Sequence, residues 1–260
     1  MTLALIFDCD GVLSDTERYG HLPAYNQMFR EMGLPIQWSV EEYGDKLRIC
    51  GGKERLTSLL TDDFVRAAGL STEIVSQTAE VARWYKRKTE IYTQMVTAGC
   101  LPPRPGIRRI ITEALEAGWR LAVASTSAPE SVKAVLNMAA GPAAARRFAG
   151  VFAGDIVPKK KPAPDVYTHA LERIGVNRDQ CLAIEDSENG VSAAVAAGIK
   201  CVVTVNAYTE QEDFTQASLV VSSLGDPGKP PISVLANRCG VRPKAFVTLR
   251  DLQACLHDIH

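Results

Sequence analysis

Short apolar runs recur along the chain and alternate with longer stretches in which apolar residues return at helical spacing. The runs cover residues 3–7, 121–124, 151–153, 181–184, 201–205 and 219–221. Runs of this length between helical stretches are typical of buried parallel strands, which are covered on both faces. The pattern therefore predicts an α/β layer fold, in which functional groups lie beyond the carboxyl ends of the strands.

The first two predicted strands are separated by more than a hundred residues, far more than a crossover helix requires. Within this stretch, apolar residues repeat at helical spacing over residues 24–32, 54–60, 62–68 and 74–97. We therefore expect a helical cap domain over residues 16–100, inserted into a discontinuous α/β core of residues 1–15 and 101–260. Leu101-Pro-Pro-Arg-Pro-Gly106 is rich in helix breakers and is expected to form the return hinge.

The last part of the chain carries no candidate chemistry. Gly225-Asp-Pro-Gly-Lys-Pro-Pro231 predicts a turn-rich linker, and residues 245–249 have the pattern of one more strand before a short helical end. We assign no function to residues 226–260.

Composition narrows the classes of protein to consider. With 260 residues and 46% hydrophobic composition, the chain can bury the core of a globular enzyme. Its 29 basic and 30 acidic residues give a net charge of −1, which argues against nucleic acid or a membrane as a partner. No run of 18 apolar residues exists to span a membrane. We also expect the protein to be a monomer. Any anionic ligand must therefore be held by a local site.

The cysteines and the N-terminus bear on the compartment. The seven cysteines are odd in number and scattered, and no Cys-x-x-Cys pair suggests zinc or redox chemistry. We expect free thiols in a reducing compartment. The N-terminus enters the first predicted strand at once, without the charged and apolar regions of a secretory signal.

Two carboxylates follow the first apolar run, in Asp8-Cys9-Asp10-Gly11. Side chains two positions apart on extended backbone point to the same side, so Asp8 and Asp10 can face one metal ion and one substrate. The alternative is an ordinary strand-to-turn transition, because Asp and Gly are common turn residues.

Two further segments carry groups suited to anions. Ser125-Thr126-Ser127 follows the run 121–124, where hydroxyls and backbone N–H groups can bind phosphate oxygens, although Ser and Thr are also favoured helix caps. In Lys159-Lys160-Lys161-Pro162, the proline restricts the backbone, so the Lys161 ammonium can act as a fixed charge for phosphate. A solvated basic run is the alternative, and we favour it for Lys159 and Lys160.

A second pair of acids, Glu185 and Asp186, follows the apolar run 181–184. Carboxylate oxygens at a strand end suit Mg²⁺. An Asx-type helix start is the alternative interpretation.

Taken together, the Asp-x-Asp-Gly strand end, the strand-end hydroxyls, the lysine before proline and the acidic pair resemble the four motifs of the haloacid dehalogenase superfamily, in the same order. The resemblance implies a Rossmann-like parallel sheet core with an inserted helical cap of the four-helix type. It also implies that Asp8 is a nucleophile that forms an aspartyl-phosphate. Asp10 would act first as general acid and then as general base.

The same resemblance implies a set of ligands for phosphate and metal. The phosphate would be bound by Ser125, Thr126 and Lys161. The cofactor would be Mg²⁺, held by Asp8, the main-chain carbonyl of Asp10, Glu185 and Asp186. These groups suit phosphoryl transfer, which requires an in-line nucleophile and neutralisation of the charge that spreads over the phosphoryl oxygens.

Across nearly the whole chain, the sequence resembles the CbbY-like branch of this superfamily. The segments that carry the resemblance are Phe7-Asp-Cys-Asp-Gly-Val12, Gly51-Gly-Lys-Glu-Arg55, Lys88-Thr-Glu90, Arg104-Pro-Gly106, Phe152-Ala-Gly-Asp155 and Lys160-Lys-Pro162. Members of this branch are phosphatases that remove the phosphosugar xylulose-1,5-bisphosphate, an inhibitor of Rubisco. Gly20-His21, Gly44 and Gly225-Asp-Pro227 are similar to plant and algal members, which implies the chloroplast stroma, with a bacterial cytoplasm as the alternative.

The expected cap contains candidate substrate-binding residues. Two glycines in Gly51-Gly-Lys-Glu-Arg55 let the backbone approach a ligand, so Gly52 and Lys53 would fit a second phosphate. The alternative is a helix N-terminus with surface charges, in which Arg55 pairs with a nearby acid. Glu17 and His21 lie four residues apart, a spacing that aligns side chains on a helix, and are candidates for hydroxyl recognition.

Three rival functions stay open at this point. A phosphosugar mutase of the β-phosphoglucomutase type uses the same core motifs but returns the phosphoryl group to sugar. A dehalogenase needs no second aspartate, whereas Asp10 is present. An inactive binding or scaffold protein would be expected to have lost a carboxylate or the lysine, and all of them are present.

Overall fold

A computed structural model of the chain describes residues 2–49 and 51–257. The chain divides into two compact units. The first unit consists of Met1–Asp15 and Pro102–His260, and the second of Thr16–Leu101. In the part of the chain that the structure describes, no helix is long and apolar enough to cross a membrane.

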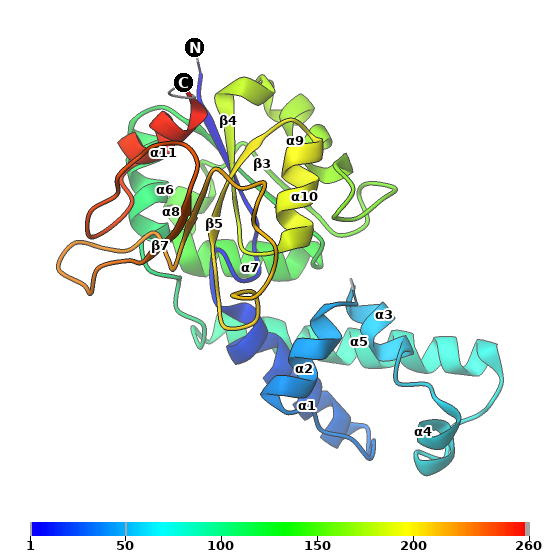
Figure 1. Ribbon diagram of the computed structural model, residues 1–260. Helices are drawn as coiled ribbons and strands as arrows, with labels where there is room; N and C mark the ends of the chain where they lie inside the picture. The colour runs from blue at the N-terminus through cyan, green and yellow to red at the C-terminus, as the bar shows by residue number, and fades with distance from the viewer. Residues whose placement is uncertain (1, 50, 258–260) are drawn as a thin grey trace. The chain divides into compact units, whose positions relative to one another are not determined.

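The first unit is built on a seven-stranded sheet with the order β3-β2-β1-β4-β5-β6-β7 (Figure 1). Neighbouring strands are parallel from β3 to β6, and β7 alone pairs antiparallel at the edge. The strands are β1 (Ala4–Phe7), β2 (Arg120–Ser125), β3 (Gly150–Ala153), β4 (Cys181–Glu185), β5 (Lys200–Thr204), β6 (Leu219–Val221) and β7 (Val234–Asn237). All six predicted apolar runs form strands, and the predicted Rossmann-like α/β sheet is confirmed.

Helices cover both faces of this sheet. One face carries α9 and α10, while α6 covers the other face with α7 and α11 packed against it (Figure 1). The helices of the first unit are α6 (Ile107–Glu116), α7 (Pro129–Ala140), α8 (Pro142–Ala145), α9 (Asp165–Ile174), α10 (Glu188–Ala196) and α11 (Leu249–Leu256), with a short 3₁₀ turn η2 (Arg178–Gln180).

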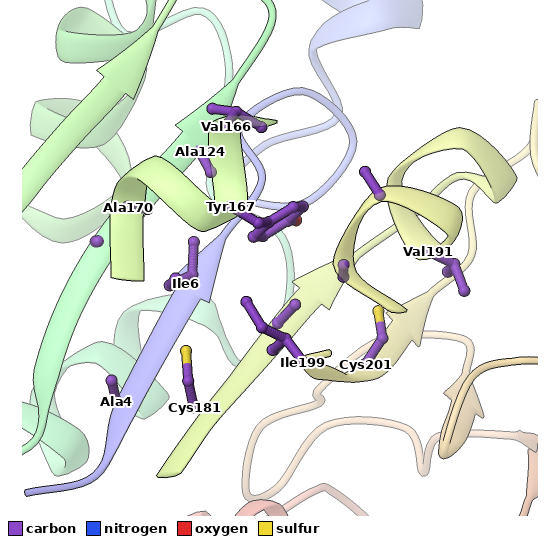
Figure 2. Packing of buried hydrophobic residues seen from close by; sticks show 14 of the residues in the cluster. Ala4, Ile6, Ala124, Val166, Tyr167, Ala170, Cys181, Val191, Ile199 and Cys201 are labelled. Atoms are coloured by element: carbon purple, nitrogen blue, oxygen red, sulfur yellow. The ribbon is translucent and has the colours of Figure 1, made fainter. Parts of the chain in front are cut away.

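Alternation along the strands directs polar groups as well as apolar ones. Ala4 and Ile6 of β1 and Cys181 of β4 belong to the apolar cluster that α9 and α10 complete (Figure 2). Because side chains two positions apart share a face, the next members of these rows are Asp8 and Glu185. The strands thus direct both carboxylates toward the α9 and α10 side, at the carboxyl edge of the sheet.

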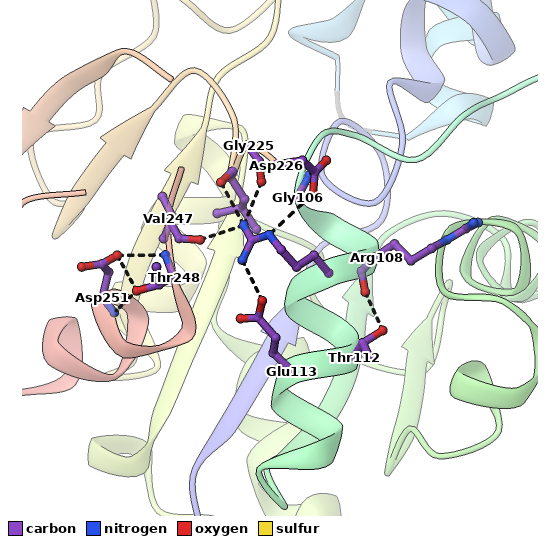
Figure 3. A network of polar contacts seen from close by, with 11 residues as sticks. Gly106, Arg108, Thr112, Glu113, Gly225, Asp226, Val247, Thr248 and Asp251 are labelled. Atoms are coloured by element: carbon purple, nitrogen blue, oxygen red, sulfur yellow. Dashed lines mark hydrogen bonds and ion pairs between the residues drawn. The ribbon is translucent and has the colours of Figure 1, made fainter. Parts of the chain in front are cut away.

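The predicted strand at residues 245–249 is wrong. Its backbone bonds go to two separate loops, since Ile232 N donates to Ala245 O at 3.1 Å and Val247 N donates to Leu224 O at 2.9 Å. The edge strand is β7 instead. The tail is also held by Arg109 of α6, whose guanidinium donates to the carbonyls of Gly225 and Val247 (Figure 3).

The regular elements described in the second unit are helices. They comprise a π-helical turn η1 (Glu17–His21) and the helices α1 (Leu22–Glu31), α2 (Val40–Leu47), α3 (Gly52–Thr57), α4 (Asp62–Ala67) and α5 (Ile74–Thr97). The long α5 packs against α1 and α3. The four predicted helical stretches are confirmed, and α2 is an addition. Its start is marked by a capping box between Ser39 and Glu42, a signature that the sequence does carry.

Candidate active site

The first member of the site, Asp8, follows β1 directly. Its backbone N–H donates to the carbonyl of Ile184 at 2.9 Å, which continues the pairing of β1 with β4 by one residue. The residue is 8% exposed, and Oδ1 accepts a hydrogen bond from Lys161 Nζ at 2.7 Å. Asp8 is therefore a nearly buried carboxylate held in one orientation by a cation.

After Asp8 the chain makes a tight turn that only glycine allows. Gly11 has a φ of 79°, and a Cβ atom there would lie 2.0 Å from Asp186 Oδ2. The Gly11 N–H donates to Ser14 O at 2.9 Å, and the Ser127 hydroxyl donates to Asp10 Oδ2. The turn interpretation of this segment is thus correct as local geometry. It coexists with a site, because the turn holds Asp10 against the end of β2.

The strand-end hydroxyls do not cap a helix. The N-cap of α7 is Ala128, which provides no side-chain hydrogen bond. Instead Ser125 Oγ accepts from the backbone N–H of Ser127 at 3.2 Å, and Ser127 faces Asp10. Thr126 lies between them, half-buried, in the same strand-end loop. The helix-cap alternative is wrong, and the Ser127 hydroxyl contacts the turn that bears Asp10.

Lys161 lies at the centre of the charged groups. Its ammonium carries three protons, and it donates to Asp8 Oδ1 at 2.7 Å, to Glu185 Oε1 at 2.6 Å and to the carbonyl of Ala124 at 2.9 Å. By contrast, Lys160 pairs with the exposed Asp155 at 3.1 Å. The expected distinction between Lys161 and its neighbour in the basic run therefore holds in the structure.

The second acidic pair completes a cluster. Ligand atoms of Asp8, Glu185 and Asp186 all lie within 4.8 Å of one another, and all three side chains are buried. The N-cap of α10 is Ser187, so neither acid starts that helix. The Asx-type alternative is wrong. The Asp10 carboxylate is outside this cluster, and the expected contribution of its main-chain carbonyl stays a prediction.

Two side chains that the sequence did not predict support the acids. The hydroxyl of Tyr167, on α9, donates to Glu185 Oε1, and Nδ2 of Asn206 donates to Asp186 Oδ2 at 2.6 Å. Asn206 follows β5, so the rule that functional groups lie beyond strand ends could have found it. Tyr167 has no such signal, because its ring belongs to the apolar cluster (Figure 2). The ring also lies 5.0 Å from Lys161 Nζ, so both the ring and the hydroxyl border the site.

The electrostatics of the cluster show an excess of negative charge. Burial raises the pKa of Asp8 to about 7, with Lys161 opposing the shift and Glu185 adding to it. Burial, and then the charge of Asp8, raise the pKa of Asp186 well above its usual value. Burial alone would lower the pKa of Lys161, but Asp8 and Glu185 outweigh it and raise that pKa.

This donor set fits a hard divalent cation. One ammonium cannot balance three neighbouring carboxylates, and buried carboxylates are costly unless they are paired or coordinate a metal. All donors are oxygen atoms, which Mg²⁺ prefers. Among residues 2–49 and 51–257, Asp8, Glu185 and Asp186 are a group of side chains that could hold Mg²⁺.

In the second unit, Glu17 belongs to a separate polar cluster. Its carboxylate accepts a hydrogen bond from the Tyr43 hydroxyl and lies 3.9 Å from Arg55 Nη1. Arg55 also donates to the carbonyl of Ile49 at 3.0 Å. Its side chain is 13% exposed, so Arg55 is the partner of an acid, as the alternative proposed, but not at the surface.

His21 has different partners from Glu17. Its Nδ1 lies 2.7 Å from Nζ of the buried Lys88, and its ring stacks on Tyr92 with centroids 3.9 Å apart. Glu17 and His21 are the first and last residues of a π-helical turn, and their side chains contact different groups. The sequence pattern gives Lys88 no role beyond its place in the segment Lys88-Thr-Glu90, which resembles the CbbY-like proteins.

Gly52 and Lys53 begin α3 in the second unit. A Cβ atom on Gly52 would lie 2.7 Å from the ring of Tyr85 and 2.9 Å from the Tyr25 hydroxyl. The Lys53 ammonium is exposed and lies 5.4 Å from the centroid of the Tyr85 ring. The glycine is therefore required by close packing, and the lysine charge is accessible to a ligand.

Comparison with known proteins identifies relatives over most of the chain. The family model described as haloacid dehalogenase-like hydrolase matches residues 2–198. A CBBY-like protein of Arabidopsis thaliana is 42% identical over 228 residues, which cover 86% of this chain and 70% of that protein. Protein CbbY, plasmid, of Cupriavidus necator is 45% identical over 228 residues, which cover 87% of each.

Solved structures agree. CbbY from Rhodobacter sphaeroides in complex with phosphate has a TM-score of 0.77 and 36% identity to this chain, covering 88% of this chain and 97% of that one. A variant of the same protein in complex with xylulose-1,5-bisphosphate has a TM-score of 0.75 at the same identity and coverage.

Acidic groups at the carboxyl edge of a parallel sheet are typical of an α/β enzyme, and the family match places this one among the hydrolases. The chain belongs to the haloacid dehalogenase-like hydrolase family, and within it to the CbbY-like proteins. It is a phosphatase.

Proposed function

We propose that the protein is a Mg²⁺-dependent phosphatase that removes the C1 phosphate of xylulose-1,5-bisphosphate. The observation that supports this proposal most directly is the cluster in which Lys161 holds Asp8 and Glu185 beside Asp186. The similarity to a CbbY protein solved with xylulose-1,5-bisphosphate supports the choice of substrate. The reaction would remove an inhibitor of Rubisco, in the chloroplast stroma or in a bacterial cytoplasm.

In the first step Asp8 attacks phosphorus and becomes an aspartyl-phosphate. Its Oδ1 is fixed by Lys161, which leaves Oδ2 as the attacking atom. The attack requires the ionised carboxylate, and the buried environment raises the pKa of Asp8 to about 7. Mg²⁺, when held by Asp8, Glu185, Asp186 and the Asp10 carbonyl, would supply positive charge that favours the ionised carboxylates and neutralises the phosphoryl oxygens.

The second role belongs to Asp10. A sugar alkoxide is a poor leaving group, so a positioned acid contributes roughly 10²–10⁴-fold. The Ser127 hydroxyl holds Asp10 Oδ2 in place, and the turn at Gly11 fixes the backbone. After protonating the leaving oxygen, Asp10 takes a proton from water, which hydrolyses the aspartyl-phosphate.

Ser125, Thr126 and Lys161 are proposed to bind the transferring phosphate. For the second unit we propose a cap that recognises the rest of the substrate. Lys53 would bind the remote phosphate beside Gly52, and Glu17 and His21 would recognise hydroxyls. The polar clusters of Glu17 and His21 support this assignment, because both side chains are oriented by neighbouring groups.

The experiment is release of inorganic phosphate, with and without Mg²⁺, from a panel of phosphosugars. The panel contains xylulose-1,5-bisphosphate, ribulose-1,5-bisphosphate, fructose-1,6-bisphosphate and β-glucose-1-phosphate, with Asp8→Asn as the control for contaminating phosphatases. We expect Mg²⁺-dependent release with a strong preference for xylulose-1,5-bisphosphate. Release spread evenly over the panel would overturn the substrate assignment. Conversion of β-glucose-1-phosphate to the 6-phosphate without release would instead establish a mutase.

A further inference from the structure

Two cysteines of the C-terminal segment meet inside the first unit. The Sγ atoms of Cys239 and Cys255 lie 2.8 Å apart. The two residues are 4% and 0% exposed, respectively. A disulfide joins its sulfur atoms at about 2.05 Å, so a side-chain movement of less than about 1 Å separates these thiols from a bond. The two cysteines are separated by 15 residues, so they do not form a Cys-x-x-Cys motif and the sequence does not predict that they meet.

The chemistry of this pair differs from that of other buried cysteines in the unit. Burial raises the pKa of Cys181 to about 12 and that of Cys201 well above its usual value, so both stay protonated and unreactive. The hydrogen bond from Cys255 lowers the pKa of Cys239 to about 7. Near neutral pH the Cys239 thiol is therefore partly ionised to a thiolate. Cys239 is also the less completely buried member of the pair.

We propose that Cys239 and Cys255 are a redox-active dithiol that closes to an intramolecular disulfide on reaction with a small-molecule disulfide such as oxidised glutathione. The Cys239 thiolate attacks one sulfur of the oxidant, which forms a mixed disulfide and releases one thiol. Cys255 then loses its proton and attacks Cys239 Sγ, which releases the second thiol. Two cysteine thiols are oxidised, and one disulfide molecule is reduced to two thiols.

The bond would fasten the tail of the chain to the sheet. Cys239 follows β7, and its N–H donates to the carbonyl of Ser218, next to β6, at 3.2 Å. Cys255 lies on α11, which packs against β4, β5 and α6. The segment between them is already held to α6 by Arg109, which donates to Val247 O, and within it the Thr248–Asp251 capping box starts α11 (Figure 3). Closing this loop restricts the unfolded chain more than the folded one.

The bond would lie away from the acidic cluster. Ser218 precedes β6, so Cys239 is near the amino end of a parallel strand, whereas the acids follow the carboxyl ends of β1 and β4. We therefore expect oxidation to change stability and leave turnover within about twofold. This inference is independent of the proposed substrate, and its test needs none.

The test equilibrates the folded full-length protein with oxidised or reduced glutathione, blocks remaining thiols by alkylation, and maps tryptic peptides by mass spectrometry. Cleavage after Arg238, Lys244 and Arg250 separates the two cysteines, so a disulfide appears as the peptide that begins at Cys239 joined to the one that begins at Asp251. We expect this linked peptide in the oxidised sample and a rise of about 5–10 °C in the midpoint of thermal unfolding. Dithiothreitol should reverse both effects.

Cys239→Ser and Cys255→Ser should each abolish the linked peptide and the thermal shift. Cys100→Ser removes an exposed thiol and should leave both unchanged, which makes it the matched control. The proposal is wrong if the folded wild-type protein yields only separately alkylated or separately glutathionylated Cys239 and Cys255. It is equally wrong if the linked peptide forms only after the protein has been unfolded in urea. The wild-type peptide map decides the question even if a serine variant does not fold.

Discussion

In the first unit three buried carboxylates lie around one ammonium, whereas in the second unit the buried ammonium of Lys88 lies among aromatic rings and a histidine. Asp8, Glu185 and Asp186 surround Lys161, which also lies 5.0 Å from the centroid of the Tyr167 ring. Lys88 lies 4.5 Å from the centroid of the Tyr25 ring, 5.2 Å from that of Tyr92 and 2.7 Å from His21 Nδ1. The first site thus gathers several acids around one cation, and the second gathers ring faces around one cation.

This difference indicates what the first unit can bind. Several buried carboxylates favour binding of a cation. The pKa values of Asp8 and Asp186 are raised because burial and the neighbouring acids disfavour their ionised forms. The comparison supports a metal and reaction centre in the first unit. For the second unit, the proposal of phosphosugar recognition depends on the exposed Lys53 and is tested through that residue.

The largest effect is expected for Asp8→Asn. An amide cannot act as the nucleophile, so release of phosphate from xylulose-1,5-bisphosphate should fall by at least about 10⁴-fold. Circular dichroism should show an unchanged fold, because Lys161 keeps its bond to Glu185. Turnover near the wild-type rate would refute the aspartyl-phosphate mechanism.

Asp10→Asn should be nearly as damaging, with a fall in kcat of roughly 10²–10⁴-fold, because the leaving oxygen loses its proton donor. Substrates with better leaving groups need less protonation, so the loss in kcat/KM, which covers only the steps up to transfer of the phosphoryl group to Asp8, should be smaller with an aryl phosphate. Measuring both substrates separates acid catalysis from misfolding. An equal loss on both would contradict the role of Asp10 as general acid, and near-normal kcat would exclude it from the chemistry.

Tyr167→Phe should weaken Mg²⁺ binding by about 10-fold, since partners that orient metal-ligating carboxylates typically contribute 10–100-fold to affinity. The variant removes the bond to Glu185 Oε1 and keeps the ring in the apolar cluster. Isothermal titration with Mg²⁺ alone measures the change without substrate. Tyr19→Phe, which alters an exposed tyrosine of the second unit, is the control and should bind as the wild type does. Unchanged affinity in Tyr167→Phe would show that the tyrosine only packs.

The smallest effect belongs to the second unit. Lys53→Ala should raise KM for the bisphosphate by about 5–10-fold with little change in kcat, because it removes charge that is used equally in substrate and transition state. Lys86→Ala removes another exposed lysine of the same unit and serves as the control. A fall in kcat without a rise in KM would place Lys53 outside remote-phosphate binding.

Local sequence patterns predict much of the fold and part of the candidate site. The order of the strands in the chain, the helices 24–32 and 74–97, and the position of Asp8 and Glu185 at strand ends follow from apolar runs and from alternation, which involve neighbouring residues only. The helix α2 was missed although Ser39 and Glu42 mark its start, since its apolar residues are few. The strand predicted at residues 245–249 failed because its backbone found partners in distant loops.

Local sequence patterns predict the strands, the helical stretch after the first strand and the identity of the charged groups, because strand and helix periods, turn residues and motif order involve nearby residues. The contact of Tyr167 with Glu185, the different partners of Glu17 and His21, and the contact of Cys239 with Cys255 appear only in the folded chain. These pairs lie far apart in the chain. Their contacts depend on how helices pack against the sheet and against one another, which no short segment encodes.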